Sequence, residues 1–496
     1  MAFFRDCSSV TGADLRIARQ EQGESTRDPL DDSELAPNSA NGSIPSQITR
    51  IAPKPPGNAD PVPFFLFILV NATLFIRPAE LVPALEAVPI YLILIIACLA
   101  ISLPAVLEQM SPRRLVEQPI SACVVGILIA VVLSHLAHAD LLLARTEGFE
   151  FSKVALYYFL LIGVLDSPGR LRSFLTWLAI FIIILTGLAL IHYHGIAEIP
   201  ALKALERTDY DEKTGEQIIV LQLMSTGIYN DPNDLCLILV AGIMISAYQL
   251  SERRIGLDRL LWLAPIGMFT YALILTKSRG GFLALLGSFM VLFTTRFGWR
   301  RAIPLAVIVL PAMFLLSGGR QTRISADEDS AQSRILLWSD GFALLKQSPL
   351  TGIGANKYGD YLGNAAHNSF VHAYTELGIL GGTFFLGAWY LPLWMLHRLG
   401  TCRAEILAPD LRGFRPFLMA MVAGYAIGIL SLSRNYVVPT YMVVGLAVVF
   451  IRVAPVAPPE MIPRLSGRLV RRLIVVGIYF MIILSIFIKL TAKYVG

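Results

Sequence analysis

One group of residues that could do chemistry lies in a short polar turn between two apolar runs. The turn reads Lys277-Ser278-Arg279-Gly280-Gly281 and combines two cations with two glycines. Glycine lets another backbone or a ligand approach closely, and Arg and Lys both bind phosphate. The turn is therefore a candidate anion site. The alternative is a pair of basic side chains that extend to a membrane surface.

A second candidate is Arg334, within the run Ser333-Arg334-Ile335-Leu336-Leu337-Trp338. Arg334 and Trp338 are four residues apart and would share one face of a helix. The run is amphipathic, so it could lie along a membrane surface. The alternative is simple packing of its apolar residues with Arg334 in solvent. The turn-rich stretch from Pro349 to Gly354 is predicted to fold the following chain back on itself.

The third candidate is His367, which precedes an apolar run beginning near 376. An imidazole with a pKa of about 6.5 is largely neutral at neutral pH. It could take a proton from a hydroxyl group, and such a base contributes roughly 10²–10⁴-fold to a rate. The alternative is a hydrogen-bonded histidine at a membrane interface.

Weaker candidates are a basic residue between two late apolar runs, two histidine pairs and two D-x-D patterns: Arg434, His192 with His194, His135 with His138, Asp209-Tyr210-Asp211 and Asp327-Glu328-Asp329. A D-x-D pattern can hold a divalent ion on a phosphate, but solvated loops carry the same pattern. No metal site or cofactor is predicted. The G-x-x-x-x-G-K-[ST] loop is absent from the sequence, so any donor substrate would be activated elsewhere.

The composition shows what kind of chain must position these residues. Hydrophobic residues make up 55% and charged residues 16%, whereas soluble proteins carry about 25% charged residues. This excludes an ordinary soluble enzyme. The 41 Lys and Arg residues are spread among apolar runs, so no nucleic-acid partner is expected.

Apolar runs of membrane-spanning length provide the scaffold, since a helix needs roughly 20 residues to cross the hydrocarbon core. Thirteen runs are predicted, at about 62–76, 85–103, 118–137, 150–166, 170–192, 233–250, 257–275, 280–295, 301–317, 376–396, 413–432, 436–452 and 471–490. Only helices satisfy their own backbone hydrogen bonds across so many spans. The sequence therefore predicts an all-α, polytopic membrane protein with about 12–13 transmembrane helices embedded in a lipid bilayer.

Residues 1–60 differ from the rest, with nine acidic and six basic residues and many Ser, Pro and Gly. They are predicted to form a disordered cytoplasmic tail, and residues 61–496 a single transmembrane domain. With the N-terminus inside, the short inner loops hold 19 basic residues and the outer ones five. The positive-inside rule favours this orientation. This orientation places the long loops 193–232 and 318–375 outside. With thirteen spans, the C-terminus would lie outside as well.

The ordered motifs resemble those of the O-antigen ligase family, whose relatives include O-antigen polymerases and bacterial protein O-oligosaccharyltransferases. The family pattern H-[NSQ]-x9-G-x-x-G is matched by His367-Asn368 and Gly378-Ile379-Leu380-Gly381. The pattern R-x3-L at the outer end of a span is matched by Arg279 to Leu283. Similar stretches lie at Ser278–Gly281, Arg334–Trp338 and Gly352–Gly354, and the resemblance covers about 225–400.

The resemblance implies a metal-independent glycosyltransferase of the bacterial inner membrane with a periplasmic active site. Its donor would be a glycan on undecaprenyl diphosphate. The acceptor is left open among lipid A core, a growing glycan and a protein hydroxyl. Family members have both termini inside, so a thirteenth span departs from the family.

Together with the residue chemistry, the resemblance gives a mechanistic hypothesis. Arg279 and Arg334 would bind the diphosphate, with Lys277 and Arg434 as further contacts. His367 would accept the proton of the acceptor hydroxyl, which attacks C1 from the face opposite the diphosphate and inverts it.

Four residues within the matched stretch are expected to support this site. Asn368 or Glu376 would orient the imidazole of His367, and Gly378 and Gly381 complete the pattern. Rival functions are a flippase or other transporter of lipid-linked oligosaccharides, a scaffold of an export machine, and a metal-dependent transferase that uses the D-x-D residues.

Overall fold

The computed structural model describes residues 60–202, 205–210, 217–301, 303–304, 307, 328–401, 405–406, 408–454, 456–457 and 462–492. Three of the sequence predictions lie wholly or mostly outside this part of the chain: the disordered tail 1–60, the apolar run 301–317 and the pattern that begins at Asp327.

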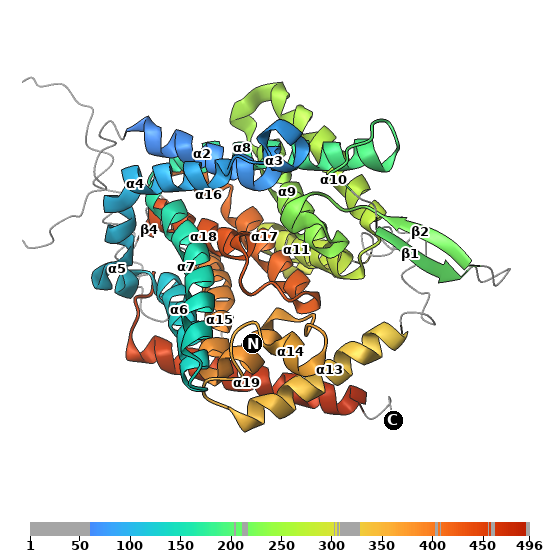
Figure 1. The fold of residues 1–496 in the computed structure, drawn as a ribbon. Coiled ribbons are helices and arrows are strands. Elements are labelled where there is room, and N and C mark those ends of the chain that lie inside the picture. Colours follow the sequence, from blue (N-terminus) through green and yellow to red (C-terminus); the bar gives the residue numbers. More distant parts are fainter. Residues whose placement is uncertain are drawn as a thin grey trace, which may run out of the picture. The chain divides into compact units, whose positions relative to one another are not determined.

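Helices dominate the described residues (Figure 1). The apolar runs correspond to α2(Pro61–Ile76), α4(Ile90–Met110), α6(Pro119–Leu136), α7(Leu141–Val164), α8(Pro168–Tyr193), α9(Pro232–Ser251), α10(Leu263–Thr276), α11(Arg279–Phe297), α15(Ser369–Thr401), α17(Arg415–Gly428), α18(Val438–Val453) and α19(Gly467–Ala492). The connections contain α3(Pro78–Leu81), α5(Pro112–Glu117), α13(Glu328–Gln347), α14(Tyr358–Leu362) and α16(Pro409–Arg412). Two small antiparallel sheets pair β1(Leu205–Tyr210) with β2(Gln217–Gln222) and β3(Glu405–Ile406) with β4(Val456–Ala457).

Eight of the described helices are long and apolar enough to cross a membrane, and three shorter apolar helices accompany them. α7 is as long as these spans but carries Arg145, Glu147, Glu150 and Lys153. The predicted all-α, polytopic fold is confirmed. The number of crossings and the sides of the loops stay predictions.

The N-termini of three helices meet, and side chains hold them together. Ser278, which caps α11, donates a hydrogen bond to Asn233 in the first turn of α9 at 2.6 Å. Ser369, the first residue of α15, donates to the carbonyl of Leu432 at 2.7 Å. The backbone of Gly280 lies so close to Ser431 that an added Cβ would clash with the Ser431 hydroxyl. Because helix N-termini carry partial positive charge, their convergence favours an anion.

α15 is kinked at Gly378, whose backbone has φ 66° and ψ −168°. The amide of Ile379 donates to the carbonyl of Pro349 at 2.8 Å, and the amide of Gly354 donates to the carbonyl of Glu376 at 3.0 Å. The stretch from Pro349 to Gly354 thus folds back, as predicted, and supplies hydrogen-bond partners to the opened turn of α15. A glycine is required at 378 because only glycine adopts this backbone conformation readily.

We expect Gly378→Ala to reduce the yield of folded protein sharply. The left-handed backbone costs a side chain about 1–3 kcal/mol, and the new Cβ would lie 2.3 Å from the carbonyl oxygen of Leu350. Monodisperse yield after detergent extraction and thermal unfolding measure the effect. Gly359→Ala is the matched control, because a Cβ at Gly359 meets nothing within 4 Å. Equal yields for the two variants would contradict the assigned role of Gly378.

α19 runs antiparallel to α15. The guanidinium of Arg472 stacks on Trp394 at 4.1 Å, the ring of Phe480 packs on Phe370 at 5.4 Å, and Phe487 packs on Trp338 of α13 at 6.3 Å. The C-terminal part of α19 therefore lies beside α13, as Figure 1 shows at one end of the bundle. The side of the membrane on which the C-terminal end and the loop 318–375 lie stays a prediction.

Candidate functional site

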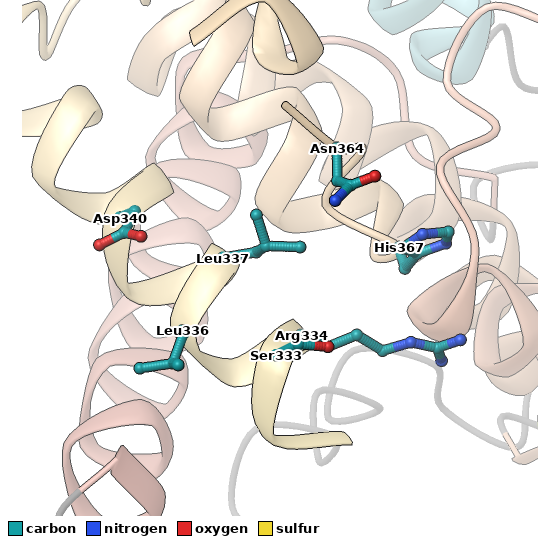
Figure 2. Close-up of a pocket in the computed structure, with 7 residues that line it drawn as sticks. All are labelled: Ser333, Arg334, Leu336, Leu337, Asp340, Asn364 and His367. Atoms are coloured by element: carbon teal, nitrogen blue, oxygen red, sulfur yellow. The ribbon is translucent and has the colours of Figure 1, made fainter. Parts of the chain in front are cut away.

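His367 and Arg334 line the same cavity, which has a volume of about 420 Å³. Its walls are Ser333, Arg334, Leu336, Leu337, Asp340, Asn364 and His367. Figure 2 shows the side chain of Arg334 extending from α13 beneath the imidazole of His367. The structure thus brings together two residues that are 33 positions apart in the sequence.

Trp338 fixes this arrangement. Its indole Nε1 donates a hydrogen bond to the carbonyl of Ala366, the residue before His367, at 2.6 Å. Trp338 lies one helical turn after Arg334 in α13, so the two side chains leave the same face of the helix. The predicted helix around Arg334 is therefore present, and its packing residue ties Arg334 to the segment that carries His367.

The environment of His367 favours a neutral imidazole. Burial and the positive charge of Arg334 lower its pKa, the charges of Arg434 and His372 act in the same direction, and Asp231 opposes them. His367 also has a left-handed backbone, with φ 49°, which is uncommon for a residue other than glycine. A half-buried neutral imidazole beside a guanidinium is suited to accept a proton while the guanidinium binds an anion.

Asn368 has a different task from the one expected. Its side-chain oxygen accepts hydrogen bonds from the backbone amides of Phe370 at 3.0 Å and Val371 at 3.2 Å. Asn368 therefore caps α15 and holds the backbone next to His367, instead of orienting the imidazole. A capping residue directly before an apolar helix is a signal that the sequence does contain.

We expect Asn368→Ala to lower the free energy of unfolding by about 1 kcal/mol, the usual value of a helix cap. Thermal unfolding of the purified protein measures this change. Asn368→Ser preserves a capping oxygen and should unfold like the parent protein. If the Ser variant is as unstable as the Ala variant, Asn368 acts through something other than the cap.

Glu376 is fully buried and orients a different histidine from the one expected. Its carboxylate lies 2.9 Å from Nε2 of His372 and accepts hydrogen bonds from the amide of Tyr358 at 2.9 Å and the hydroxyl of Tyr436 at 2.8 Å. The expectation that Glu376 orients His367 is therefore corrected. The spacing of His372 and Glu376, one helical turn apart, could have indicated their contact.

Arg434 forms an ion pair with Asp234, in which both carboxylate oxygens accept from the guanidinium. Its backbone amide donates to the Ser369 hydroxyl at 2.8 Å. Arg434 thus joins α9 to α15 at the meeting point of the helix N-termini. Its positive charge lowers the pKa of His367. Any bound diphosphate would share the guanidinium of Arg434 with Asp234.

Arg279 and Lys277 lie in the tight turn between α10 and α11. Lys277 has a left-handed backbone with φ 54°, and Arg279 is the first residue of α11. Since Gly280 contacts Ser431, this turn adjoins the segment that leads to Arg434. A role for both cations in binding a diphosphate remains a proposal.

Gly378 and Gly381 act through the backbone and packing. Gly378 forms the kink that opens α15 beside Glu376. A Cβ at Gly381 would lie 2.9 Å from that of Ala130 in α6, so glycine allows the two helices to approach closely. The two glycines shape the helix that follows His367.

A second cavity of about 1250 Å³ was not anticipated from the sequence. One wall is apolar and comes from α4, with Leu92, Ile95 and Ile96. The polar lining residues include His372, Ser433, Arg434, Asn356 and Glu147. Leu92 and Ile96 are more than half exposed in the isolated chain, so the apolar wall adjoins the lipid-facing surface of α4.

The other histidine candidates have separate partners. Nδ1 of His192 accepts the amide of Ile199 at 3.3 Å, and Nε2 of His194 lies 3.0 Å from the hydroxyl of Tyr271. Nδ1 of His138 contacts the carbonyl of Ser134 at 2.8 Å, while His135 packs near Gly354. Within the described ranges, no three His, Cys, Asp or Glu residues are grouped so that they could hold a metal ion.

Comparison with known proteins agrees with the resemblance seen in the motifs. Residues 264–386, which include Lys277, Arg279, Arg334 and His367, match the family described as O-Antigen ligase. None of the curated proteins and none of the solved structures matches the chain. The match over residues 264–386 is consistent with the O-antigen ligase family.

Proposed function

We propose that this protein is a membrane glycosyltransferase that moves a glycan from undecaprenyl diphosphate to an acceptor hydroxyl, most closely in the manner of an O-antigen ligase. The observation that carries the proposal is the cavity shared by His367 and Arg334 within the matched family segment. It combines a proton acceptor with an anion-binding group, the two functions that such a transfer requires.

In the proposed reaction, the acceptor oxygen forms a bond to C1 of the donor sugar as the bond from C1 to the diphosphate oxygen breaks. The electron pair of that bond leaves with the diphosphate, whose growing charge Arg334 and Arg279 stabilise. His367 receives the proton of the acceptor hydroxyl. Attack from the face opposite the diphosphate inverts the configuration at C1. No step requires a metal or a cofactor.

The bilayer contributes the route of entry. The donor carries a long apolar chain, and the exposed residues of α4 beside the large cavity provide an apolar surface. We propose that the lipid enters sideways from the bilayer. The protein would lie in the bacterial inner membrane with its N-terminus in the cytoplasm and its site on the periplasmic side, as the charge distribution of the loops indicates.

Deletion of the gene in its host, followed by mass spectrometry of surface glycans, lipids and proteins, tests the proposal. Accumulation of lipid-linked glycan with loss of glycan-capped lipid A would identify a ligase. Loss of long chains with single repeat units retained would identify a polymerase, and loss of glycosylated protein would identify a protein transferase. Unchanged glycans on all three classes would refute the proposed function.

A further inference from the structure

A chain of hydrogen bonds outside the His367 cavity links a buried carboxylate to the large cavity. Nε2 of His372 lies 2.9 Å from Oε1 of Glu376, and Nδ1 of His372 lies 3.0 Å from the hydroxyl of Ser433. Glu376 is fully buried. Both His372 and Ser433 line the large cavity, so the chain ends where a ligand could bind.

Two aromatic side chains hold the imidazole in place. The ring of Tyr358 stacks on His372 with centroids 5.1 Å apart and an angle of 15° between the planes. Tyr436 meets the same imidazole edge-on at 6.4 Å while its hydroxyl donates to Glu376. The imidazole is therefore fixed by its ring contacts as well as by its two nitrogen atoms.

Glu376 determines which atom donates and which accepts in each of these hydrogen bonds. A carboxylate can only accept hydrogen bonds, and Oε1 of Glu376 already accepts the backbone amide of Tyr358. His372 therefore donates through Nε2, and in its neutral form the ring keeps a lone pair on Nδ1. Nδ1 accepts the hydroxyl hydrogen of Ser433. The Ser433 oxygen is then left with lone pairs only and must accept a hydrogen bond from whatever lies in the cavity.

The lining of the cavity indicates the kind of ligand that would donate this bond. The wall from α4 is apolar, whereas the side around Ser433 carries charged and amide groups, including Glu147 and Asn356, which are hydrogen-bonded to each other. Such a cavity fits an amphipathic molecule with an apolar chain and a polar head. A sugar is a polar head with many hydroxyl donors.

We propose that Ser433 binds a sugar hydroxyl of a glycolipid substrate in the large cavity, with His372 and Glu376 as positioning residues that make Ser433 an obligatory hydrogen-bond acceptor. The inference rests on the proposed glycosyl transfer and adds to it a residue that binds the sugar of the substrate. The hydroxyl belongs either to the acceptor glycan or to the donor glycan, and both offer the same chemistry to Ser433.

Binding of octyl β-D-glucopyranoside to the purified full chain in a sugar-free detergent tests the proposal. Ligand-observed NMR titration at alkaline pH, which favours a neutral imidazole, gives the affinity. Ser433→Ala should weaken binding roughly 3- to 10-fold, the usual value of one hydrogen bond. Ser431→Ala is the matched control, since the Ser431 hydroxyl donates to the carbonyl of Gly428.

Analogues in which fluorine replaces one hydroxyl at a time test the direction of the bond, because fluorine cannot donate. One analogue should bind the parent protein as weakly as octyl glucoside binds the Ser433→Ala variant, and that variant should not distinguish the two ligands. His372→Phe should abolish the same discrimination while Ser433 is still present, because the serine can then donate. A merely structural His372 would leave the discrimination unchanged.

Equal affinity of the parent and Ser433→Ala proteins, or equal binding of every fluorinated analogue to the parent, would overturn the proposal. Farnesyl diphosphate distinguishes the two sources of the hydroxyl. Displacement of octyl glucoside assigns the hydroxyl to the donor glycan, and simultaneous binding assigns it to the acceptor. These measurements need no glycosyl transfer, so their failure is distinct from failure of the deletion experiment.

Discussion

His367→Ala should lower the rate of glycan transfer roughly 10²–10⁴-fold, the contribution expected of a positioned general base. The acceptor hydroxyl would then lose its proton to water alone. His367 is half-buried in the cavity that Arg334 also lines, and its neutral form is favoured by burial and by that neighbouring charge. Membranes of the deletion strain that carry the variant supply donor and acceptor, and mass spectrometry quantifies the product.

His194→Ala is the matched control for this experiment. His194 stacks on Tyr271 at 5.9 Å between ring centroids and is not among the residues that line the two cavities. The control should transfer glycan at the parent rate. Full activity of His367→Ala would exclude the imidazole as the base and favour transport or simple binding.

Much of the fold could be predicted because membrane helices are encoded locally. A run such as 118–137 is mostly apolar and holds no Asp, Glu, Lys or Arg, and α6 covers Pro119–Leu136. α7 is harder to recognise, because the charged residues of its first turns interrupt the apolar pattern. The run predicted at 150–166 is thus only the second half of a helix that begins at Leu141.

The residues of the candidate site could be predicted where they belong to a short sequence motif. His367 and Arg334 stand in recognisable patterns, and their shared cavity agrees with those patterns. Contacts between distant segments could not be predicted. Asp234 and Arg434 are 200 positions apart, and His372 and Ser433 are 61 apart. No periodicity links residues at such separations, because only the packing of the helices brings them together.

Roles within the motif were also beyond the sequence, although the residues were identified. Asn368 and Glu376 both lie near His367 in the chain, and proximity suggested that either one orients its imidazole. The helix that begins at Ser369 turns their side chains elsewhere, so Asn368 caps that helix and Glu376 contacts His372. The direction in which a helix presents each side chain decides such roles.

Arg334→Gln should change both the rate of transfer and its dependence on pH. Loss of the guanidinium would remove the proposed bidentate contact to the diphosphate, and one such stabilising group is worth roughly 10²–10³-fold in rate. The positive charge of Arg334 also lowers the pKa of His367, because a nearby cation disfavours the imidazolium form. Without that charge the pKa of His367 rises, so the neutral base forms only at higher pH.

The rate of transfer should therefore rise as the pH is raised from acidic values. The midpoint of this rise should lie at a higher pH in Arg334→Gln than in the parent protein. Arg334→Lys separates the two effects. Lysine retains the positive charge and should keep the midpoint near that of the parent, while its single ammonium replaces the planar fork and lowers the rate. If the midpoint stays fixed in both variants, then either His367 is not the titrating base or Arg334 is not near enough to influence it. Because the cavity places the two residues together, a fixed midpoint would remove His367 from the reaction and leave Arg334 as a binding residue alone.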